Sequence, residues 1–548
     1  MTNEGFLKAY EPIVSAPGGI HRLRGIILDL AVSGRLVEQD PNDEPSEVLL
    51  ERVAASRAKA FVSNGWRVSG SAGSISEAEI PFPCPRSWSW VRLEALALPQ
   101  AGFAFKSSGF NQSGVGLPLI RIRDIGNDTT ECHYDGEFRP EFLVEPGDYL
   151  VGMDGNFNIR RWGGPPALLN QRVTRLIFFD EDIQRPLVAS ALQARINALH
   201  GSRAYTTVQH LSGKQIAAAV IPLAPRAEQH RIIVRVDELM ALCDQLQEAQ
   251  EQAETLRIAT GKSAFAALVD SDCDDHEFAS NLLNKQFTRV LEPGEGARAM
   301  VNELRATILD LAVRGRLVEQ DPSDEPAAVL LMRISAERDA LIREGVLRQP
   351  KGATAAARVV GTHETPDSWE WSDFGNLVRS YDSSRKPVSR EVRESGPYPY
   401  LGASGQIDSV AGWLLEGTFL LIAEDGGDFW GRPKRVAYMF GGRFWPNNHV
   451  HVVDGLAGFN KQYLKTVVNA SSMEGLITGI AVPKLAWKGL KALRVPVPPL
   501  AEQHRIVQRV DELMGLCDQL EAAYTDERNL AVALGESVAS ALRGERTA

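Results

Sequence analysis

The stretch AEQHRIIVRVDELMALCDQL, residues 227–246, decides the fold, because it returns as AEQHRIVQRVDELMGLCDQL at residues 501–520. Only three of the 20 positions differ between the two copies. Apolar residues in both recur in alternating steps of three and four, the spacing that places them on one face of an α-helix. The chain is therefore an internal duplication built around two copies of one long helix.

The apolar stripe of these helices has a seven-residue repeat, which favours pairing with a second helix because one helix cannot bury such a stripe alone. We expect the two copies to pack against each other antiparallel or to bind the same partner twice; the alternative is an ordinary amphipathic helix on a core. In the first case Leu239, Cys243 and Leu246 lie near Leu513, Cys517 and Leu520. The predicted helix-pairing residues are Ile232, Val236, Leu239, Cys243, Leu246, Ile506, Val510, Leu513, Cys517 and Leu520.

A second repeat opens each half: residues 23–53 return at 304–334 with eight differences in 31 positions. The pattern predicts two helices joined by a turn, with Gly34 just past the end of the first and Asp43 capping the second. A hairpin that reads DNA is the alternative to a structural hairpin. The structural hypothesis is favoured, because the same sequence in both halves would read the same bases twice.

A third repeat marks the entrance to a domain in each half, PRSWSWVRL at residues 85–93 and PDSWEWSDF at 366–374. We expect Trp88 and Trp369 to pack the first strand onto a core, with base stacking as the alternative. Beyond this entrance the two halves diverge into short β-type runs broken by Gly, Pro, Asp and Asn. A frame repeated faithfully around two different inserts indicates a protein that recognises two different things.

Composition and charge fit a soluble protein: 44% of the 548 residues are hydrophobic, and no apolar run approaches the ~18 residues of a membrane span. The five cysteines include no C-x-x-C pair, so neither a disulfide framework nor a zinc site is expected, and the cytoplasm is the expected location. The net charge of −11 argues against a nucleic-acid binder, yet its distribution does not. Residues 91–221 hold 13 basic and 13 acidic side chains, and residues 373–497 hold 15 and 11.

Loops 156–162 (NFNIRRW) and 428–435 (DFWGRPKR) combine an aromatic residue with cations, a composition used to hold phosphates and reach base edges. The strand that follows each loop begins with amide residues, Asn170 and Gln171 in the first block and Asn447 and Asn448 in the second, which can pair with adenine or, alternatively, cap a turn. The candidate DNA-binding residues of the first block are Lys106, Arg121, Arg123, Asn156, Asn158, Arg160, Arg161, Asn170, Gln171, Arg172 and Arg203. Those of the second block are Arg385, Lys386, Trp430, Arg432, Lys434, Arg435, Asn447, Asn448, His449 and Lys484.

Catalytic signatures are missing from the sequence. The segment ATGKS at 259–263 lacks the first glycine of a phosphate-binding loop, and there is no methyltransferase Asn-Pro-Pro-aromatic motif or nucleophile elbow. His449 and His451 lack a clear third metal ligand, and Glu424 and Asp425 fit a solvated glycine turn. We therefore expect no catalytic residues, no bound metal and no enzymatic activity in this chain.

Together the paired LR-x₂-IL-x-LAV-x-GRLVEQDP-x-DEP segments, the two P-x-SW-x-W entrances and the two P-x-AEQHRI…VDEL helices resemble one family, over nearly the whole chain. This family is the DNA-specificity subunit of type I restriction-modification systems. The resemblance implies an α+β fold in which two α/β target-recognition domains are separated by long antiparallel coiled-coil helices. The expected parts are helical regions 1–64 and 297–346, target-recognition domains 85–225 and 366–499, and long helices 226–270 and 500–545.

The resemblance also implies partners. Each target-recognition domain is expected to read one half of an asymmetric bipartite site in double-stranded DNA, and the helices to dock two methyltransferase subunits. Two translocase–nuclease subunits can join such a core in this family. No cofactor is expected here, because S-adenosylmethionine, ATP and Mg²⁺ belong to the partner subunits. The alternatives are a duplicated protein-binding scaffold without a DNA role, and an enzyme that modifies or cuts DNA by itself.

Overall fold

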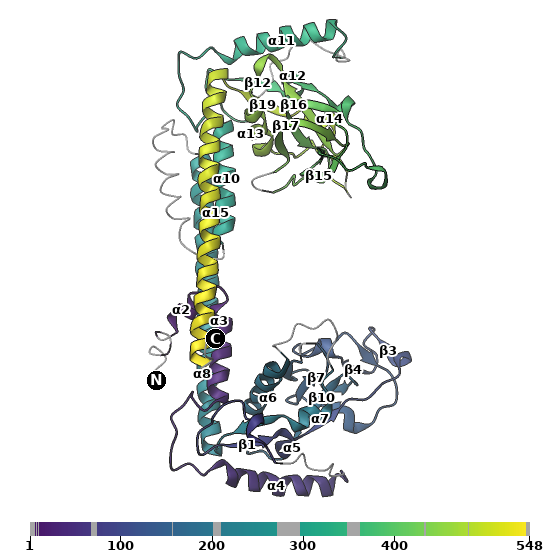
Figure 1. Cartoon of the computed structure of the whole chain (residues 1–548), viewed down its shortest axis with the longest axis vertical. Coiled ribbons are helices and arrows are strands. Elements are labelled where there is room, and N and C mark those ends of the chain that lie inside the picture. Colours follow the sequence, from purple (N-terminus) through teal and green to yellow (C-terminus); the bar gives the residue numbers. More distant parts are fainter. Residues whose placement is uncertain are drawn as a thin grey trace. The chain divides into compact units, whose positions relative to one another are not determined.

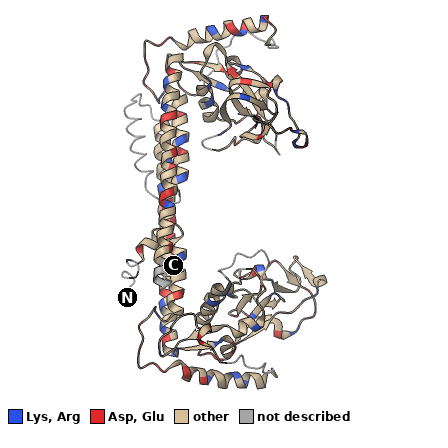
Figure 2. Ribbon diagram, in the orientation of Figure 1, with Lys and Arg blue, Asp and Glu red and all other residues tan. Residues whose placement is uncertain are grey.

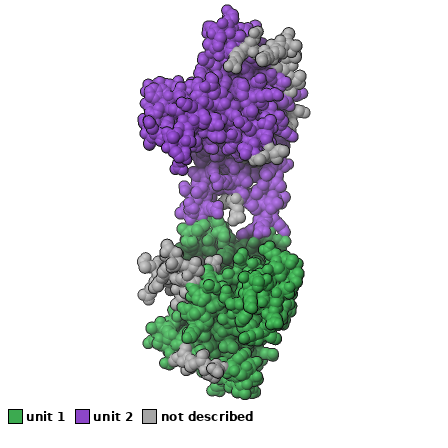
Figure 3. Space-filling view, turned by 90° about the vertical axis from the view of Figure 1, so that its right-hand side faces the viewer, with its two compact units in different colours: residues 1–249, 531–548 green, residues 250–530 purple. Residues whose placement is uncertain are grey.

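The computed structural model describes residues 6, 8, 10–66, 74–155, 157–200, 210–270, 296–347, 362–431, 435–479 and 482–543. The chain divides into two compact units (Figures 1 and 3). Unit 1 comprises Met1–Ala249 with Ala531–Ala548, and unit 2 comprises Gln250–Leu530. Each unit combines helices with β-sheets, so the α+β class and the internal duplication are confirmed.

Unit 1 contains a helical hairpin, a first mixed domain and the beginning of a long helix. The elements are α2 (Glu11–Val14), α3 (Gly19–Val32), α4 (Ser46–Ser63), β1 (Ser89–Arg92), α5 (Leu93–Leu96), β2 (Ala97–Ala101), β3 (Phe110–Asn111), β4 (Leu117–Ile120), β5 (His133–Tyr134), β6 (Leu143–Val144), β7 (Tyr149–Gly152), β8 (Ile159–Arg161), β9 (Ala167–Leu169), β10 (Val173–Phe178), α6 (Arg185–His200), α7 (Gly213–Ala218), β11 (Val220–Leu223) and α8 (Arg226–Asp270). Short 3₁₀ turns connect several of these, among them η3 (Ile122–Asp124).

Unit 2 repeats this order with a second hairpin, a second domain and a second long helix. The elements are α10 (Ala297–Val313), α11 (Ala327–Arg343), β12 (Glu370–Asp373), α12 (Phe374–Leu377), β13 (Val378–Ser380), β14 (Tyr398–Gly402), β15 (Gly405–Val410), β16 (Leu415–Ala423), β17 (Ala437–Pro446), β18 (Val450–Gly455), α13 (Lys461–Ala470), α14 (Trp487–Leu490), β19 (Arg494–Val497) and α15 (Leu500–Arg543). Helix α8 begins in unit 1 and ends in unit 2, and α15 does the reverse. Each unit thus contains the start of one long helix and the end of the other, as expected for two helices that run in opposite directions.

The two domains share a strand pattern although their sequences diverge. Entrance and exit strands form an antiparallel pair in each, β1 with β11 and β12 with β19. The orders β2-β10-β7-β8 and β13-β18-β16-β17 correspond, as do the parallel pairs β4–β9 and β14–β17. The second domain joins these into one six-stranded sheet, whereas the first keeps a separate sheet of order β3-β5-β4-β9-β6.

The three repeated segments meet one another in unit 1. Glu228, in the first turn of α8, is 1% exposed, and its carboxylate accepts hydrogen bonds from Trp88 Nε1 (2.9 Å) and Gln39 Nε2 (2.5 Å). Gln39 also donates to the Gly34 carbonyl at 3.2 Å. Gly34 follows α3 with φ +70°, and a Cβ there would lie 2.6 Å from Pro85, so only glycine lets the hairpin approach the domain entrance. We call the contact of Glu228 with Trp88 and Gln39 the carboxylate clasp.

The carboxylate clasp of unit 2 has the same construction. Glu502 is 1% exposed and accepts from Trp369 Nε1 (3.0 Å) and Gln320 Nε2 (2.6 Å). Burial raises the pKa of both Glu228 and Glu502, although the hydrogen bonds oppose this shift. Trp88 and Trp369 are buried, as predicted for packing at the entrance rather than for stacking on bases.

The turn of each hairpin is held by an ion pair rather than by the predicted helix cap. Helix α4 begins at Ser46 with Pro45 as its N-cap, so the expectation that Asp43 caps this helix was wrong. Asp43 instead binds Arg231 of α8, with Oδ2 to Nη2 at 2.6 Å, and Asp324 binds Arg505 of α15 at 2.7 Å. An arginine more than 180 residues away in sequence thus binds each carboxylate directly.

The apolar stripe of each long helix is buried, but the two repeated stretches lie in separate cores. Leu239 and Cys243 belong to a core with Leu23, Ile26 and Ile27 of α3, and Leu246 packs against the same core. Leu513 and Cys517 belong to a separate core, with Leu304 and Ile308 of α10, and Leu520 packs against it. Ile232 lies in the core of the first domain, and Val236 packs against that core. Ile506 and Val510 instead lie in the core that contains residues of α10. The prediction that these two sets pack on each other was therefore wrong, because the first helix of each hairpin, α3 or α10, packs against the stripe.

In each unit an arginine of the first hairpin helix forms an ion pair with the long helix, at equivalent positions of the repeat. The two arginines differ in how deeply they are buried. Arg24 of α3 binds Asp244 at 2.6 Å with its side chain 28% exposed. Arg305 of α10, 6% exposed, binds Asp518 at 2.6 Å and Glu521 at 2.8 Å. Acidic and basic residues are interspersed along these helices (Figure 2).

Removing the carboxylate of one clasp should destabilise its own unit. Glu228→Ala leaves Trp88 Nε1 and Gln39 Nε2 without their acceptor in a buried place, which should lower the free energy of unfolding by about 1–3 kcal/mol. Differential scanning calorimetry of the full chain measures this change. Glu502→Ala is the matched variant, and unchanged melting in both would contradict the role of the clasp.

The two ion pairs between hairpin and long helix should differ in strength. Arg24→Ala removes an exposed pair and should cost about 0–1 kcal/mol. Arg305→Ala removes charged hydrogen bonds from a buried guanidinium and should cost about 1.5–3 kcal/mol. Denaturant unfolding of the two variants checks the order, and equal costs would show that burial of Arg305 has no energetic consequence.

Candidate nucleic-acid interface

In the first domain an aspartate holds two basic side chains where three chain segments meet. Beyond β7, the amide of Met153 donates to the carbonyl of Arg172 (3.1 Å), and the amide of Leu211 donates to the carbonyl of Met153 (2.7 Å). Asp154, the next residue, lies 3.0 Å from Arg172 Nη1 and 2.9 Å from His210 Nδ1. Backbone pairing therefore brings together side chains that are 18 and 56 residues apart in sequence.

The second domain builds the same backbone arrangement from different residues, although the Asp425 side chain binds His449 and the Lys484 side chain binds Glu424. The amide of Glu424 donates to the carbonyl of His449 (2.9 Å), and the amide of Leu485 donates to the carbonyl of Glu424 (2.7 Å). Asp425 lies 2.6 Å from His449 Nδ1, and its backbone bridges to Lys484 as that of Asp154 bridges to His210. Asp425, His449 and Lys484 thus correspond in place to Asp154, Arg172 and His210. We call each set an aspartate corner.

The basic side chains of both corners face solvent while their aspartates are mostly covered. Arg172, His210, His449 and Lys484 are 46–55% exposed, whereas Asp154 and Asp425 are 20% and 22% exposed. A carboxylate that holds a cation from one side leaves the other donors of that cation free for a ligand. Each corner is therefore preorganised to offer donors to anions or base edges.

A buried ion network supports the corner of the second domain. Glu424 is 8% exposed; its carboxylate binds Lys484 Nζ at 2.9 Å and Arg385 Nη1 at 2.5 Å. Burial alone would raise the pKa of Glu424, but the hydrogen bonds from Lys484 and Arg385 bring it below its usual value. His451, 1% exposed, places Nδ1 2.5 Å from Asp382 and Nε2 2.8 Å from the Leu485 carbonyl. The expectation of a solvated turn at Glu424 was wrong, because distant cations close around it.

Several candidate DNA-binding residues are exposed on the two domains, as a contact with a large ligand requires. In the first domain these are Lys106, Arg123, Asn158, Arg160, Arg161, Gln171 and Arg172. In the second domain they are Lys386, Trp430, Arg435, Asn448, His449 and Lys484. Asn156, Arg203, Arg432 and Lys434 lie outside the described residues.

Other candidates are occupied by structural roles. Arg385 is 16% exposed and forms ion pairs with Asp382 and Glu424, so its side chain stabilises the interior of the second domain. Arg121 donates Nε to Asp124 Oδ2 at 3.1 Å, which raises the pKa of the guanidinium. Asn447 is 4% exposed and its Oδ1 accepts the His449 amide at 2.8 Å. For Asn447 the structure supports the turn-capping alternative, and Asn170 Oδ1 likewise accepts the Gln171 amide at 2.8 Å.

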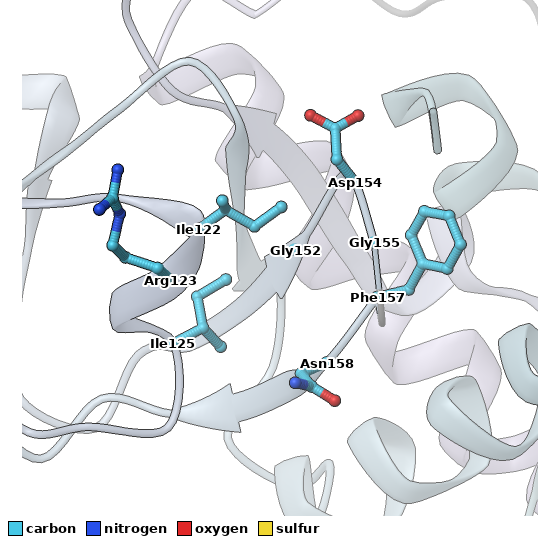
Figure 4. Close-up of a pocket in the computed structure, with 8 residues that line it drawn as sticks. All are labelled: Ile122, Arg123, Ile125, Gly152, Asp154, Gly155, Phe157 and Asn158. Atoms are coloured by element: carbon cyan, nitrogen blue, oxygen red, sulfur yellow. The ribbon is translucent and has the colours of Figure 1, made fainter. Parts of the chain in front are cut away.

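A shallow pocket of about 390 Å³ opens beside the corner of the first domain (Figure 4). Its lining residues are Ile122, Arg123, Ile125, Gly152, Asp154, Gly155, Phe157 and Asn158. Phe157 has φ +47°, uncommon for a residue with a side chain, and Gln193 of α6 hydrogen-bonds to the Phe157 carbonyl and to the amide of Ile159. The turn that forms one wall of the pocket is thus held in a strained conformation by its neighbours.

The sequence pattern missed Asp154, His210 and Asp425, whose roles depend on contacts between distant segments. Within the described ranges no cluster of three or more His, Cys, Asp and Glu side chains could hold a metal ion. A helix long and apolar enough to cross a membrane is likewise not found in the described part of the chain.

Comparison with known proteins relates this architecture to one family. Residues 366–527, which span the second domain and the first part of α15, match the model of the type I restriction modification DNA specificity domain. The type I restriction enzyme EcoEI specificity subunit of Escherichia coli is 26% identical over 95% of this chain and 94% of that protein. The EcoAI specificity subunit of Escherichia coli is also 26% identical, over the same shares of both chains.

A solved structure, the HsdS subunit from Thermoanaerobacter tengcongensis, aligns with 15% identity and a TM-score of 0.39, covering 85% of this chain and 99% of that one. Residues 366–527 match the DNA specificity domain, and over nearly its full length the chain is similar to type I restriction-modification specificity subunits, the family that its repeated motifs resemble.

Proposed function

We propose that this chain recognises DNA for a type I restriction-modification complex and that each domain reads one half of a bipartite, asymmetric site in double-stranded DNA. The observation that carries the proposal is the aspartate corner, which recurs at the same place in both domains with different basic side chains. Arg172 can pair with guanine through two donors, whereas His449 offers one ring nitrogen beyond its bond to Asp425. Equivalent positions with different donors suit two half-sites of different sequence.

The surrounding residues divide into two roles. Arg160, Arg161 and Lys106 in the first domain, and Arg435 and Lys386 in the second, are exposed cations suited to phosphate contacts. Gln171 directly precedes Arg172 and Asn448 directly precedes His449, and the exposed amides of Gln171 and Asn448 can reach base edges. Phosphate contacts would position each domain, and the corner with its neighbouring amide would supply the sequence preference.

The repeated frame supports two identical protein partners. Glu228, Ile232, Leu239 and Cys243 are identical in both long helices, and their burial explains the identity. Burial does not explain His230/His504, Asp237/Asp511 and Gln245/Gln519, which are exposed in both copies. Identical exposed surfaces suit one methyltransferase subunit docked on each half, and two translocase–nuclease subunits can complete the complex.

We further propose that catalysis belongs to these partners. S-adenosylmethionine, ATP and Mg²⁺ would bind to the methyltransferase and translocase–nuclease subunits, and the complex would act in the cytoplasm. A scaffold without a DNA role is the weaker alternative, because the matched family model is that of a DNA specificity domain.

Substitution of the basic side chain of one corner should affect one half-site alone. Arg172→Ala should weaken binding to the first half-site about tenfold or relax its sequence, because a bidentate contact is worth about 1–3 kcal/mol. His449→Ala should act in the same way on the second half-site. Mapping the methylated adenines in host DNA gives the site, and competition with duplexes altered in one half then measures each variant.

The matched control is Lys59→Ala, which removes one exposed positive charge from α4, outside the corner. It should leave both half-site preferences unchanged. If Arg172→Ala weakened all duplexes equally and only lowered the salt dependence of binding, Arg172 would be a phosphate contact and not a reader. If the chain with its partners bound no DNA preferentially, the proposed function itself would be wrong.

A further inference from the structure

We propose that the pocket beside the first corner receives the C5-methyl group of a pyrimidine, which in unmodified DNA is thymine. The inference rests on the proposed function, since it names one base feature that the first domain would recognise. The thymine methyl is the one apolar group that base pairs present in the major groove, so an apolar recess in a DNA-reading surface has a defined complement there.

The floor of the pocket is apolar within a polar stretch. Ile122 and Ile125 are only half-buried, and they stand in the sequence RIRDIGND among charged and amide side chains. In Figure 4 both side chains lie between Arg123 and the Gly152 strand. Leaving two isoleucines half-exposed costs hydrophobic free energy that an apolar ligand group would recover.

Gly152 keeps this floor open. A Cβ built at Gly152 would lie 3.4 Å from Ile122 Cγ1 and 3.4 Å from Ile125 Cδ1, which is ordinary van der Waals contact. The methyl group of an alanine at this position would therefore contact both isoleucines. The glycine leaves vacant a space that the next smallest residue, alanine, would fill from the protein side.

The rim of the pocket is suited to a nucleic acid rather than to a free apolar molecule. The cation Arg123 and the amide of Asn158 line it, both exposed, and the stem of Arg160 lies within 3.7 Å of a Cβ built at Gly126 in the adjacent turn. The carboxylate of Asp154 also lines the pocket, but Arg172 and His210 bind it. Cations around an apolar recess allow phosphates to be held while a base edge enters.

The wall of the pocket is rigid enough to discriminate between bases. Gln193 Oε1 accepts the Ile159 amide at 2.7 Å, and Gln193 Nε2 donates to the Phe157 carbonyl at 3.3 Å. The Phe157 ring is 6% exposed and anchored in the domain core. A wall held by these contacts cannot collapse into the recess when the methyl group is missing, so removal of the methyl group should cost its full contribution to binding.

The experiment removes the methyl group from the DNA. Once methylation mapping has given the target, each thymine of the half-site read by the first domain is replaced in turn by deoxyuridine. Binding of the full chain with its methyltransferase partners should weaken about fourfold at one position, the loss expected for one buried methyl group. At that position 5-methylcytosine should also bind more tightly than cytosine, because it restores the methyl group alone.

Two variants connect this effect to the pocket. Ile122→Ala empties the floor and Gly152→Ala fills it, and both should bring the ratio of thymine to uracil affinity close to one. Both should leave the thymine-to-uracil ratio in the second half-site unchanged. Because Gly152→Ala removes no side chain and has space, it keeps the test valid if Ile122→Ala lowers the melting temperature.

The outcomes separate this inference from the proposed function. Sequence-specific binding without any effect of uracil in the first half-site would overturn the methyl pocket and leave DNA recognition intact. A first half-site without thymine would also overturn it. Absence of sequence-specific binding would instead contradict the proposed function.

Discussion

One buried carboxylate in each unit joins the three repeated parts of the chain. Glu228 and Glu502 begin their long helices, yet each accepts hydrogen bonds from the entrance tryptophan and from the hairpin glutamine. A carboxylate removed from water is tolerable only when its oxygens are bonded, and a position near a helix N-terminus favours its negative charge. Hairpin, domain and long helix are thereby held together through one residue. The rest of each unit depends on this contact for its arrangement.

The carboxylate clasp explains why the frame is duplicated so closely. Gly34, Gln39, Trp88 and Glu228 must fit one another in space, and a change in any of them leaves a buried polar group unpaired or creates a clash. The loops beyond the entrance have no such constraint. They diverge in sequence but retain the backbone pairing that places an aspartate beside two basic residues, so the donors offered to a ligand differ between the domains.

The sequence was sufficient to predict which residues are buried, but not always what buries them. The spacing of Leu239, Cys243, Leu513 and Cys517 correctly predicted a covered stripe. It could not identify the partner, because a heptad pattern shows that a helix contacts another helix and does not say which one. The repeat at residues 23–53 was predicted as a hairpin, and its first helix proved to be the missing partner.

The candidate site was predicted in part for a similar reason. Exposed cations such as Arg172 are recognisable from composition, whereas their partners Asp154 and His210 are joined only by strand pairing. Asn447 shows the opposite error: an amide suited to adenine is consumed by the turn that presents His449. Composition predicts what a side chain can bind, and the fold decides whether its donors are already occupied.

The central claim is that two domains with different DNA-binding surfaces are attached to two equivalent sets of repeated helices. The most direct measurement is the recognition site of a chain in which residues 366–499 replace residues 85–225. Because Trp369 can take the place of Trp88 against Glu228 and Gln39, the second domain should fit the first frame. Methylation mapping should then find the second half-site sequence at both ends of the target. Persistence of the original first half-site sequence would contradict the account, because recognition would then reside in the frame.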